Sequence, residues 1–579
     1  MGADFDLVIR KGTILDGSGA AAFDGDVAIS GGKIAAVGKV SGSGKEEIDA
    51  KGKLVTPGFV DIHTHYDGQA TWSNTLSPSS THGVTSVVMG NCGVGFAPCR
   101  PDHHDMLLRV MEGVEEIPKP VLAEGVTWTW ESFPEYLDSL SRIHYDMDCA
   151  ALVPHAPVRV YVMGKRGADR EPATQQDALR MSQLVKEGIE AGALGFSTSR
   201  TMIHRLTDGS LAPTITAGEE ELTAIALGMK EIGKGLMQLT HDDYDVTQEG
   251  ITGLGMWRRI VETSGRPLTV SLSQKSRMFT DKWQLSLKFL EEAHRDGLPI
   301  IAQVSNRTVG VLFGLECERN PFTGCPSFER IQHLPLEQKL AEMRKPGMRA
   351  KLLSEEAFDP NPGKLTQLRR FEQMFLLGDP PNYAPPKDQN IAAVAARRGI
   401  PVLEYAYDLL IDNDGHNIFY YPATNYFDFN FEAVETMMRH PNTIQGLGDG
   451  GAHVGTICDA SLPTHMLTYW TRDRTDGEKL PLPWAVRELT SRTAGFFGLN
   501  DRGYLKPGYR ADVNVIDYDR LHLYGPRAVY DLPAGGRRLV QKADGYEATI
   551  CNGQVTYREG KHTGALPGRL VRGTQAAPV

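Results

Sequence analysis

The sequence contains no apolar run of the roughly 18 residues that a membrane-spanning helix needs, so it predicts no transmembrane segment. It also contains no basic cluster, and its net charge of −11 with a pI near 5.9 argues against a nucleic-acid-binding surface. We therefore expect neither a membrane nor a nucleic acid among its partners.

Cysteine is scarce, with seven residues, an odd number that shows no close pairing. Such cysteines are expected to be reduced thiols. The first eleven residues include Asp4 and Asp6 and lack the basic start and apolar core that are typical of a signal peptide. Together these absences predict a cytoplasmic protein.

The length of 579 residues exceeds that of one ordinary domain and fits a barrel of about 250 residues with insertions plus a smaller unit. Both ends of the chain alternate short apolar segments with glycines, as in Phe5–Ile9, Gly25–Ile29 and Ala548–Gly553. This spacing is typical of a small sheet or sandwich. We expect residues 1–57 and 499–579 to form one composite β-sandwich domain.

The middle of the chain, residues 58–498, repeats a strand-then-helix rhythm, which indicates a parallel sheet with helical crossovers. Helical patterns over Thr174–Ala191, Glu219–Ile232 and Lys282–Arg295 separate some of the strands. Eight β/α units in sequence predict an α/β fold, a (β/α)8 TIM barrel whose active site lies at the carboxyl ends of the strands. The eight candidate strands are Phe59–His65, Val84–Cys92, Ala150–His155, Ala193–Thr198, Leu236–His241, Leu268–Gln274, Ile300–Asn306 and Thr443–Asp449.

Two histidines, His63 and His65, end the first of these strands after a Pro-Gly turn and an apolar run. Side chains alternate along a strand, so the two imidazoles are expected on the same face, close enough to share one divalent ion. Surface or core histidines are the alternative explanation of the pair alone.

Other ligand-type residues stand at the ends of other predicted strands: Cys92, His155, His241 and Asp449. Each alone has an ordinary explanation, such as a small core residue for Cys92 or a solvated loop for His241. Their joint occurrence at one end of a barrel predicts a metal site.

The predicted chemistry is hydrolysis. A metal ion held by neutral imidazoles lowers the pKa of a bound water to about 7 and polarises a carbonyl oxygen. Asp449, flanked by glycines, is expected to act as general base and then general acid, with a ligand or helix-capping role as the alternative. Cys92 as a thiolate could bridge two ions.

The stretch from Gly58 through His65, the split β-rich ends and Asp449 after the eighth strand together resemble the amidohydrolase superfamily. Gly83-Val84-Thr85-Ser86-Val87-Val88-Met89-Gly90-Asn91-Cys92-Gly93 is similar to the D-aminoacylase group, the N-acyl-D-amino-acid deacylases. The resemblance implies a zinc-dependent hydrolase of amide bonds, with His63, His65, Cys92 and Asp449 at the metal centre. It also implies a small-molecule substrate, an N-acyl amino acid; the D-configuration follows from the resemblance alone.

The sixth strand departs from this pattern. The family has a histidine ligand there, followed closely by a lysine that binds the substrate carboxylate, whereas this chain has Leu272-Ser273-Gln274-Lys275. A second ion would have Cys92 and His241 but lack one imidazole. We expect one tightly bound ion, and a second ion completed by Gln274 or water remains open.

Several residues are candidates for binding the substrate or assisting catalysis. Lys275 could anchor the carboxylate, and His155 could polarise the scissile carbonyl or hold Asp449; a solvated lysine and a barrel-rim histidine are the alternatives. Ser199, Arg200 and His204 follow the fourth strand and would face the site.

The segment of about residues 307–440 is far longer than a crossover needs and predicts a lid or substrate wall. A plain surface embellishment or a contact in a homo-oligomer is the alternative. Two other functions stay open: a hydrolase of a cyclic or xenobiotic amide or ester, and a metal-poor scaffold on the same barrel.

Overall fold

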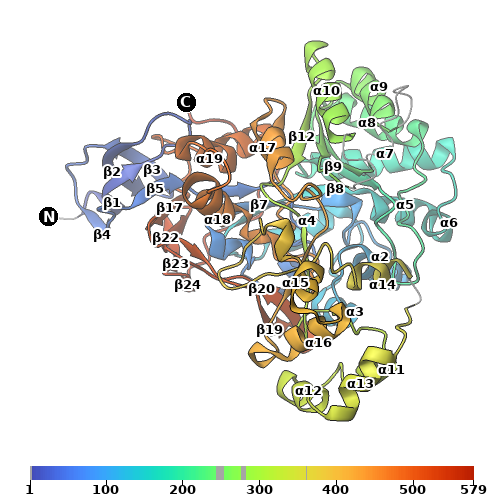
Figure 1. Ribbon diagram of the computed structural model, residues 1–579. Coiled ribbons are helices and arrows are strands. Elements are labelled where there is room, and N and C mark those ends of the chain that lie inside the picture. Colours follow the sequence, from blue (N-terminus) through green and yellow to red (C-terminus); the bar gives the residue numbers. More distant parts are fainter. Residues whose placement is uncertain (1–2, 243–252, 276–281, 360–361) are drawn as a thin grey trace.

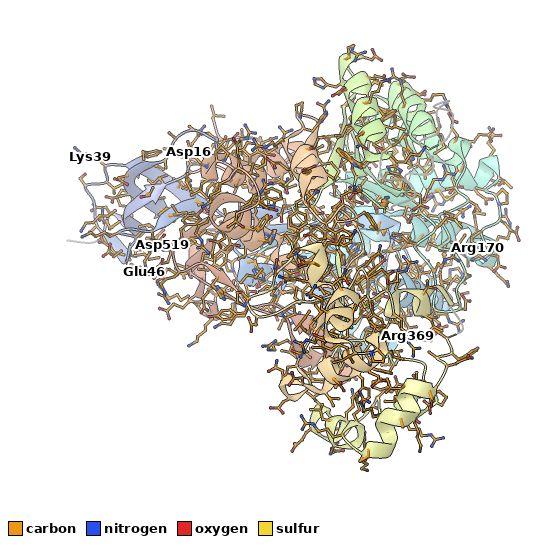
Figure 2. The ribbon with its side chains drawn as sticks, viewed as in Figure 1. Asp16, Lys39, Glu46, Arg170, Arg369 and Asp519 are labelled. Atoms are coloured by element: carbon orange, nitrogen blue, oxygen red, sulfur yellow. The ribbon has the colours of Figure 1, made fainter. Side chains whose placement is uncertain are left out.

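The computed structural model describes residues 3–242, 253–275, 282–359 and 362–579. Two large sheets organise these residues: an eight-stranded parallel sheet in the middle of the sequence and a nine-stranded sheet that joins both chain ends. In Figure 1 the nine-stranded sheet lies on the left, and the parallel strands with their covering helices lie on the right. Figure 2 places Lys39 and Glu46 at the far left of the molecule and Arg170 at its opposite side.

The eight-stranded sheet contains all eight predicted strands, in the order β16-β12-β11-β10-β9-β8-β7-β6. Backbone hydrogen bonds bring its two edges together, from Asp449 N to His63 O at 3.0 Å and from His65 N to Gly450 O at 2.7 Å. The predicted TIM-barrel core is therefore confirmed. Its strands are β6 Phe59–Asp61, β7 Val84–Met89, β8 Asp148–Pro154, β9 Gly195–Arg200, β10 Leu236–His241, β11 Leu268–Ser271, β12 Ile300–Val304 and β16 Thr443–Gln445.

The crossover helices cover the outside of the barrel. Helix α7, Gln175–Glu190, starts at a capping box in which Thr174 and Asp177 satisfy each other's backbone N–H groups. Helix α8, Glu219–Ile232, begins with three glutamates that suit the positive end of the helix dipole. These two helices and α10, Lys282–Arg295, confirm the helical patterns of the sequence. Further helices around the barrel are α2 His104–Val114, α3 Lys119–Gly125, α4 Phe133–Ser141, α5 His155–Met163, α9 Leu254–Ser264, α17 Glu432–Arg439, α19 Leu482–Leu489 and α20 Ser491–Phe496.

The nine-stranded sheet brings the two chain ends together through β5, Leu54–Pro57, which pairs with β17, Val513–Ile516. Its apolar residues, among them Ile9, Val27 and Val515, form a buried cluster of their own. The strands bury runs of apolar residues rather than alternating ones, as in β17, where all four residues are buried. The other strands are β1 Phe5–Ile14, β2 Phe23–Ser30, β3 Lys33–Gly38, β4 Gly44–Asp49, β22 Tyr546–Cys551, β23 Gln554–Arg558 and β24 Lys561–His562.

One C-terminal hairpin lies apart from that sheet. Strands β19, Arg527–Leu532, and β20, Gly536–Val540, pair only with each other within the described chain, and Leu539 N donates to Val454 O at 2.6 Å. The hairpin therefore packs beside the loop that follows the last barrel strand. The exact domain boundaries stay a prediction.

The long insertion carries a small sheet of β13 Gly310–Phe313, β14 Phe375–Leu376 and β15 Phe419–Pro422. A separate apolar cluster, which includes Phe322, Tyr407 and Phe419, packs its helices together. In Figure 1 these helices extend below the barrel. They are α11 Pro326–Glu329, α12 Leu336–Met343, α13 Pro346–Ser354, α14 Pro362–Leu368, α15 Ile391–Arg398 and α16 Val402–Ile411.

Across the described residues, we find no helix with the length and apolar character that crossing a membrane requires.

Candidate metal centre

His63 and His65 lie just beyond the end of β6, in an extended segment that is bonded on both sides. Thr64 N donates to Val88 O at 3.0 Å, and His65 N donates to Gly450 O at 2.7 Å. Both imidazoles are buried, and their ring centroids lie 5.5 Å apart. The predicted pairing of the two rings on one side of the segment is thus what the structure has, although the regular strand ends at Asp61.

Cys92 lies in a tight turn after β7. Its own backbone has φ 56°, and the neighbouring Gly90 has φ 81°. A side chain at Gly90 would meet the Leu152 carbonyl oxygen at 2.4 Å, and one at Gly93 would meet Thr198 Cα at 2.7 Å. The two glycines therefore allow the turn to press against the neighbouring strands and direct Cys92 inward. Gln238 Oε1 accepts a hydrogen bond from Cys92 N at 2.9 Å and fixes the turn.

Asp449 follows β16 in a left-handed backbone conformation, with φ 46°. Its N–H donates to His63 O, so the turn is held beside the first strand. One carboxylate oxygen, Oδ1, lies 3.3 Å from His63 Nε2 and 3.6 Å from His65 Nε2. The carboxylate, which follows the last barrel strand, thus faces the two imidazoles, which follow the first.

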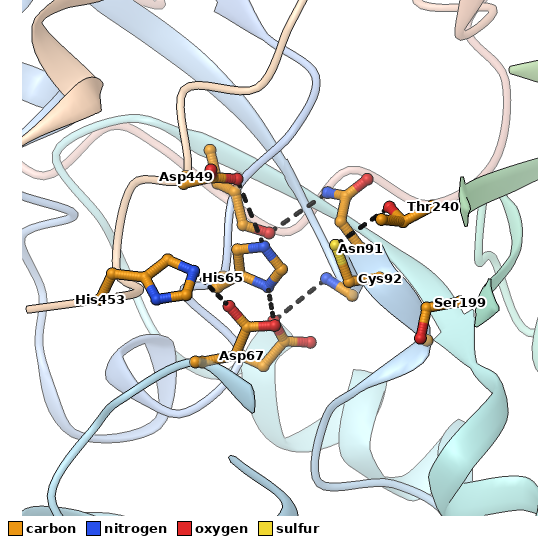
Figure 3. Close-up of polar contacts among 12 residues, drawn as sticks. His65, Asp67, Asn91, Cys92, Ser199, Thr240, Asp449 and His453 are labelled. Atoms are coloured by element: carbon orange, nitrogen blue, oxygen red, sulfur yellow. Dashed lines mark hydrogen bonds and ion pairs between the residues drawn. The ribbon is translucent and has the colours of Figure 1, made fainter. Parts of the chain in front are cut away.

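The donor atoms of His63, His65 and Cys92 all lie within 4.8 Å of one another. Cys92 Sγ is 3.4 Å from His63 Nε2, and Figure 3 shows Cys92, His65 and Asp449 gathered in one place. Imidazole, thiolate and carboxylate donors together suit Zn²⁺. By this chemistry the residues fit a metal ion.

The charges of the cluster support the same conclusion. Burial opposes the charged form of His63, but Cys92 and Asp449 raise its pKa to about 9. Burial likewise raises the pKa of the Cys92 thiol, but the neighbouring His63 and His65 outweigh it and lower the pKa. Burial also opposes ionisation of Asp449, yet the hydrogen bond from His65 and the charge of His63 hold its pKa well below the usual range. The imidazoles and the two acidic groups thus interact closely, and binding of a metal ion would release protons from them.

Each histidine has an outer partner that the sequence did not reveal. His63 Nδ1 is 2.7 Å from Gln303 Oε1, and His65 Nδ1 is 3.5 Å from Glu115 Oε1. His453 lies beyond Glu115, with its Nε2 3.7 Å from Glu115 Oε2. The sequence offered one signal for His453, which is its position four residues after Asp449 in the same glycine-rich loop. It offered no signal for Glu115, which follows helix α2 in a crossover.

His155 is not brought to this cluster. It starts α5, its Nε2 pairs with Glu221 on α8 at 2.8 Å, and its Nδ1 lies 2.9 Å from Thr198 Oγ1. Both ring nitrogens are therefore engaged between the barrel and its outer helices. The prediction that His155 polarises the carbonyl or holds Asp449 finds no contact in the described structure.

His241 ends β10 and is buried, with Nδ1 donating to Asp242 O at 2.9 Å. Burial and the nearby Lys275 lower its pKa to about 3. The neighbouring Thr240, rather than His241, contacts Cys92 Sγ, at 3.3 Å. A ligand role for His241 stays a prediction.

The proposed substrate-side residues gather near this end of the barrel. Lys275 Nζ donates to His241 O, and Ser199 Oγ lies 3.1 Å from His204 Nδ1. Burial and the charges of His453 and His65 lower the pKa of His204 to about 3. Arg200 instead reaches Met256 on α9.

Gln274 is hydrogen-bonded to residues of the insertion. Its N–H donates to Asn425 Oδ1 at 2.7 Å, and its side-chain amide donates to Asp428 Oδ2 at 3.0 Å. The alternative in which Gln274 completes a second metal site therefore finds no support in this conformation.

These features define a β/α-barrel protein with a buried imidazole, thiol and carboxylate site for a metal ion. A model of the amidohydrolase family matches residues 46–557, so the chain belongs to that family. The chain is 26% identical to D-aminoacylase of Alcaligenes xylosoxydans xylosoxydans, over 99% of this chain and 98% of that protein. It is 27% identical to the N-acyl-D-aspartate deacylase of the same organism, over 100% of this chain and 97% of that protein.

The fold also matches solved structures of similar proteins. The crystal structure of D-aminoacylase matches with a TM-score of 0.65 at 23% identity, covering 98% of this chain and 100% of that one. The structure of N-acyl-D-glutamate deacylase from Bordetella bronchiseptica, complexed with zinc and a phosphonate inhibitor, matches with a TM-score of 0.64 at 22% identity, covering 98% and 99%. The predicted relationship to the D-aminoacylases is confirmed. Family and site together support metal-dependent hydrolysis of amide bonds.

Proposed function

We propose that the protein is a zinc-dependent deacylase that hydrolyses N-acyl amino acids of D-configuration. The observation that carries the proposal is the cluster of His63, His65 and Cys92 with Asp449 Oδ1 at 3.3 and 3.6 Å from the two imidazoles. The N-acyl-D-amino-acid substrates of the similar proteins support the substrate class.

His63, His65, Cys92 and Asp449 would hold one tightly bound ion. When bound, such an ion acts as a Lewis acid that polarises the acyl carbonyl and makes water more acidic. We propose one ion because the strand-six position that would complete a second site carries Ser273 and Gln274, and Gln274 is bonded to Asn425 and Asp428.

Asp449 is the proton carrier. As a carboxylate it accepts a proton from the attacking water, whose oxygen bonds to the acyl carbon. The C–N bond then breaks, and Asp449 returns the proton to the departing nitrogen. The products are a carboxylate and a free amino acid. The lowered pKa of Asp449 favours its carboxylate form at the start of the cycle.

Lys275 is proposed to bind the substrate carboxylate. It follows β11 and donates to the backbone carbonyl of His241, so its ammonium lies at the same end of the barrel as the cluster. His204 and Ser199, which contact each other, would line the substrate space.

The test is a panel of N-acetyl and N-aroyl amino acids in both D and L forms, with a cyclic amide as an additional substrate, assayed with and without a chelator. We expect hydrolysis of the N-acyl D-amino acids, its loss with the chelator and its return with zinc. Hydrolysis of the cyclic amide alone would favour the cyclic-amide hydrolase, and chelator-insensitive hydrolysis would contradict the proposal.

A further inference from the structure

Glu115 is a buried carboxylate between two histidines. It follows α2 and is 1% exposed. Its Oε1 lies 3.5 Å from His65 Nδ1, and its Oε2 lies 3.7 Å from His453 Nε2. Glu115 Oε1 has no hydrogen-bond partner in the described structure. A carboxylate this deeply buried is costly unless it is paired with charge, so its two imidazole neighbours account for its presence.

The orientation of His65 gives Glu115 a specific task. His65 turns Nε2 toward Asp449, at 3.6 Å, and therefore turns Nδ1 outward to Glu115. A histidine that binds a metal through one ring nitrogen is commonly oriented by a carboxylate at the other, which fixes the tautomer and makes the ligand more basic. The partner of His63 is instead the neutral amide of Gln303, at 2.7 Å. The two histidines thus differ in the charge of their outer partners.

Glu116 ties this arrangement to the insertion. Its carboxylate lies 3.3 Å from His453 Nδ1, accepts from Thr456 Oγ1 at 2.6 Å and pairs with Arg319. Arg319 belongs to the insertion, in the turn after β13, where Gly314 N donates to its carbonyl oxygen at 3.0 Å. A continuous chain of charged contacts therefore runs from Arg319 through Glu116, His453 and Glu115 to His65.

The backbone along this chain is unusual. Glu116 has φ 52° and His453 has φ 48°, both in the left-handed region that non-glycine residues rarely adopt. Such conformations cost free energy and persist where surrounding contacts determine them. The contacts of Glu115 and Glu116 with His453 account for both.

We propose that Glu115 is a positioning residue for the metal ligand His65, and that Arg319 of the insertion stabilises this position through Glu116 and His453. The inference rests on the proposed function, because it assigns Glu115 to the same metal centre. Through this contact the insertion then contributes to the affinity of the centre for its ion.

The test measures zinc affinity by competition with a chromogenic chelator, a readout that requires no substrate. We expect Glu115→Ala to weaken zinc binding about 10- to 100-fold. Glu115→Gln keeps an acceptor oxygen and is expected to lose less. The matched control is Glu112→Gln on α2, the helix that precedes Glu115; the Glu112 carboxylate accepts from Lys119 N. The zinc affinity of this control should equal that of the unaltered protein.

Arg319→Gln tests the link to the insertion and removes a contact without emptying the core. We expect a smaller loss of zinc affinity, about threefold. If Arg319 acts through Glu115, the variant with both Arg319→Gln and Glu115→Ala binds zinc no more weakly than Glu115→Ala alone. Additive losses would show that the two residues act independently and would overturn the second half of the proposal.

Failure of this inference and failure of the proposed function give different results. Unaltered zinc affinity in both Glu115 variants, with tight binding by the unaltered protein, overturns the positioning role alone. Absence of zinc binding by the unaltered protein overturns the metal centre and, with it, the proposed function.

Discussion

The two sides of the barrel rim differ in their chemistry. One side, which we call the ligand side, lies at the ends of strands β6, β7 and β16, and its polar atoms converge; it consists of His63, His65, Cys92 and Asp449. The other, which we call the polar side, lies at the ends of β10 and β11, across the barrel in the sheet order. It consists of Thr240, His241, Ser271 and Gln274.

In the described structure the side chains of the polar side make hydrogen bonds, and a ligand role for His241 among them stays a prediction. Thr240 Oγ1 contacts Cys92 Sγ at 3.3 Å and Ser271 Oγ at 3.1 Å, and Gln274 is bonded to the insertion. The difference teaches that side chains at one shared rim can have different partners. The side without an imidazole on strand six bonds the insertion through Gln274, and we propose that it also binds the substrate.

The largest expected effect comes from the ligand side. Replacement of a ligand, as in His65→Ala or Cys92→Ser, should weaken zinc binding by more than the roughly 100-fold that a lost outer partner costs. Hydrolysis should fall to background without added zinc. Metal content after dialysis is the measurement, and a full complement of ion in either variant would contradict the assignment.

Asp449→Asn separates proton transfer from metal binding. Asparagine keeps one side-chain oxygen as a ligand, so with His63, His65 and Cys92 intact the variant should still bind one ion, while kcat falls about 10²- to 10⁴-fold because the proton carrier is lost. Parallel measurements of metal content and kcat check this. A kcat near that of the unaltered enzyme would remove Asp449 from the mechanism.

On the polar side, Lys275→Ala should raise KM about 10- to 100-fold for a substrate with a carboxylate, the value of a lost charged hydrogen bond. An uncharged amide of the same acyl group should be unaffected. Lys288→Ala, an exposed lysine on α10, is the control. Equal effects on the two substrates would argue against a carboxylate contact.

The smallest expected effect is a change in stability, at the place where the polar side meets the insertion. Asn425 is fully buried, and its side chain bonds Gln274 N, Ser305 Oγ and the Arg307 carbonyl. Asn425→Ala should lower the free energy of unfolding by about 1–3 kcal/mol because buried groups lose their partners. Urea unfolding measures this, with Asn430→Ala as a partly exposed control. Equal stability of the two variants would show that this contact is unimportant.

The sequence was sufficient for the barrel, because eight apolar strands separated by amphipathic helices leave few other arrangements. It was also sufficient for the pairing of His63 with His65 and for the approach of Cys92 and Asp449, since carboxyl ends of parallel strands meet at one rim. It placed these residues on strands, whereas the left-handed backbone of Cys92 and Asp449 ends the strands earlier.

The remaining features depend on contacts between distant segments. Glu115 reaches His65 only because the crossover after β7 folds back over the rim, and no local pattern encodes that path. His155 has the expected position at a strand end, but its side chain turns to Glu221 on the outer helices. The direction of a side chain at a strand end thus depends on the charged partners that neighbouring elements place near it.

The most direct test of the account counts zinc ions per chain in the unaltered protein and in His241→Asn, after metal removal and titration with zinc. We predict one tightly bound ion in both proteins, because the ligand side alone holds it. Two tightly bound ions in the unaltered protein, or none in His241→Asn, would contradict the difference between the two sides of the rim.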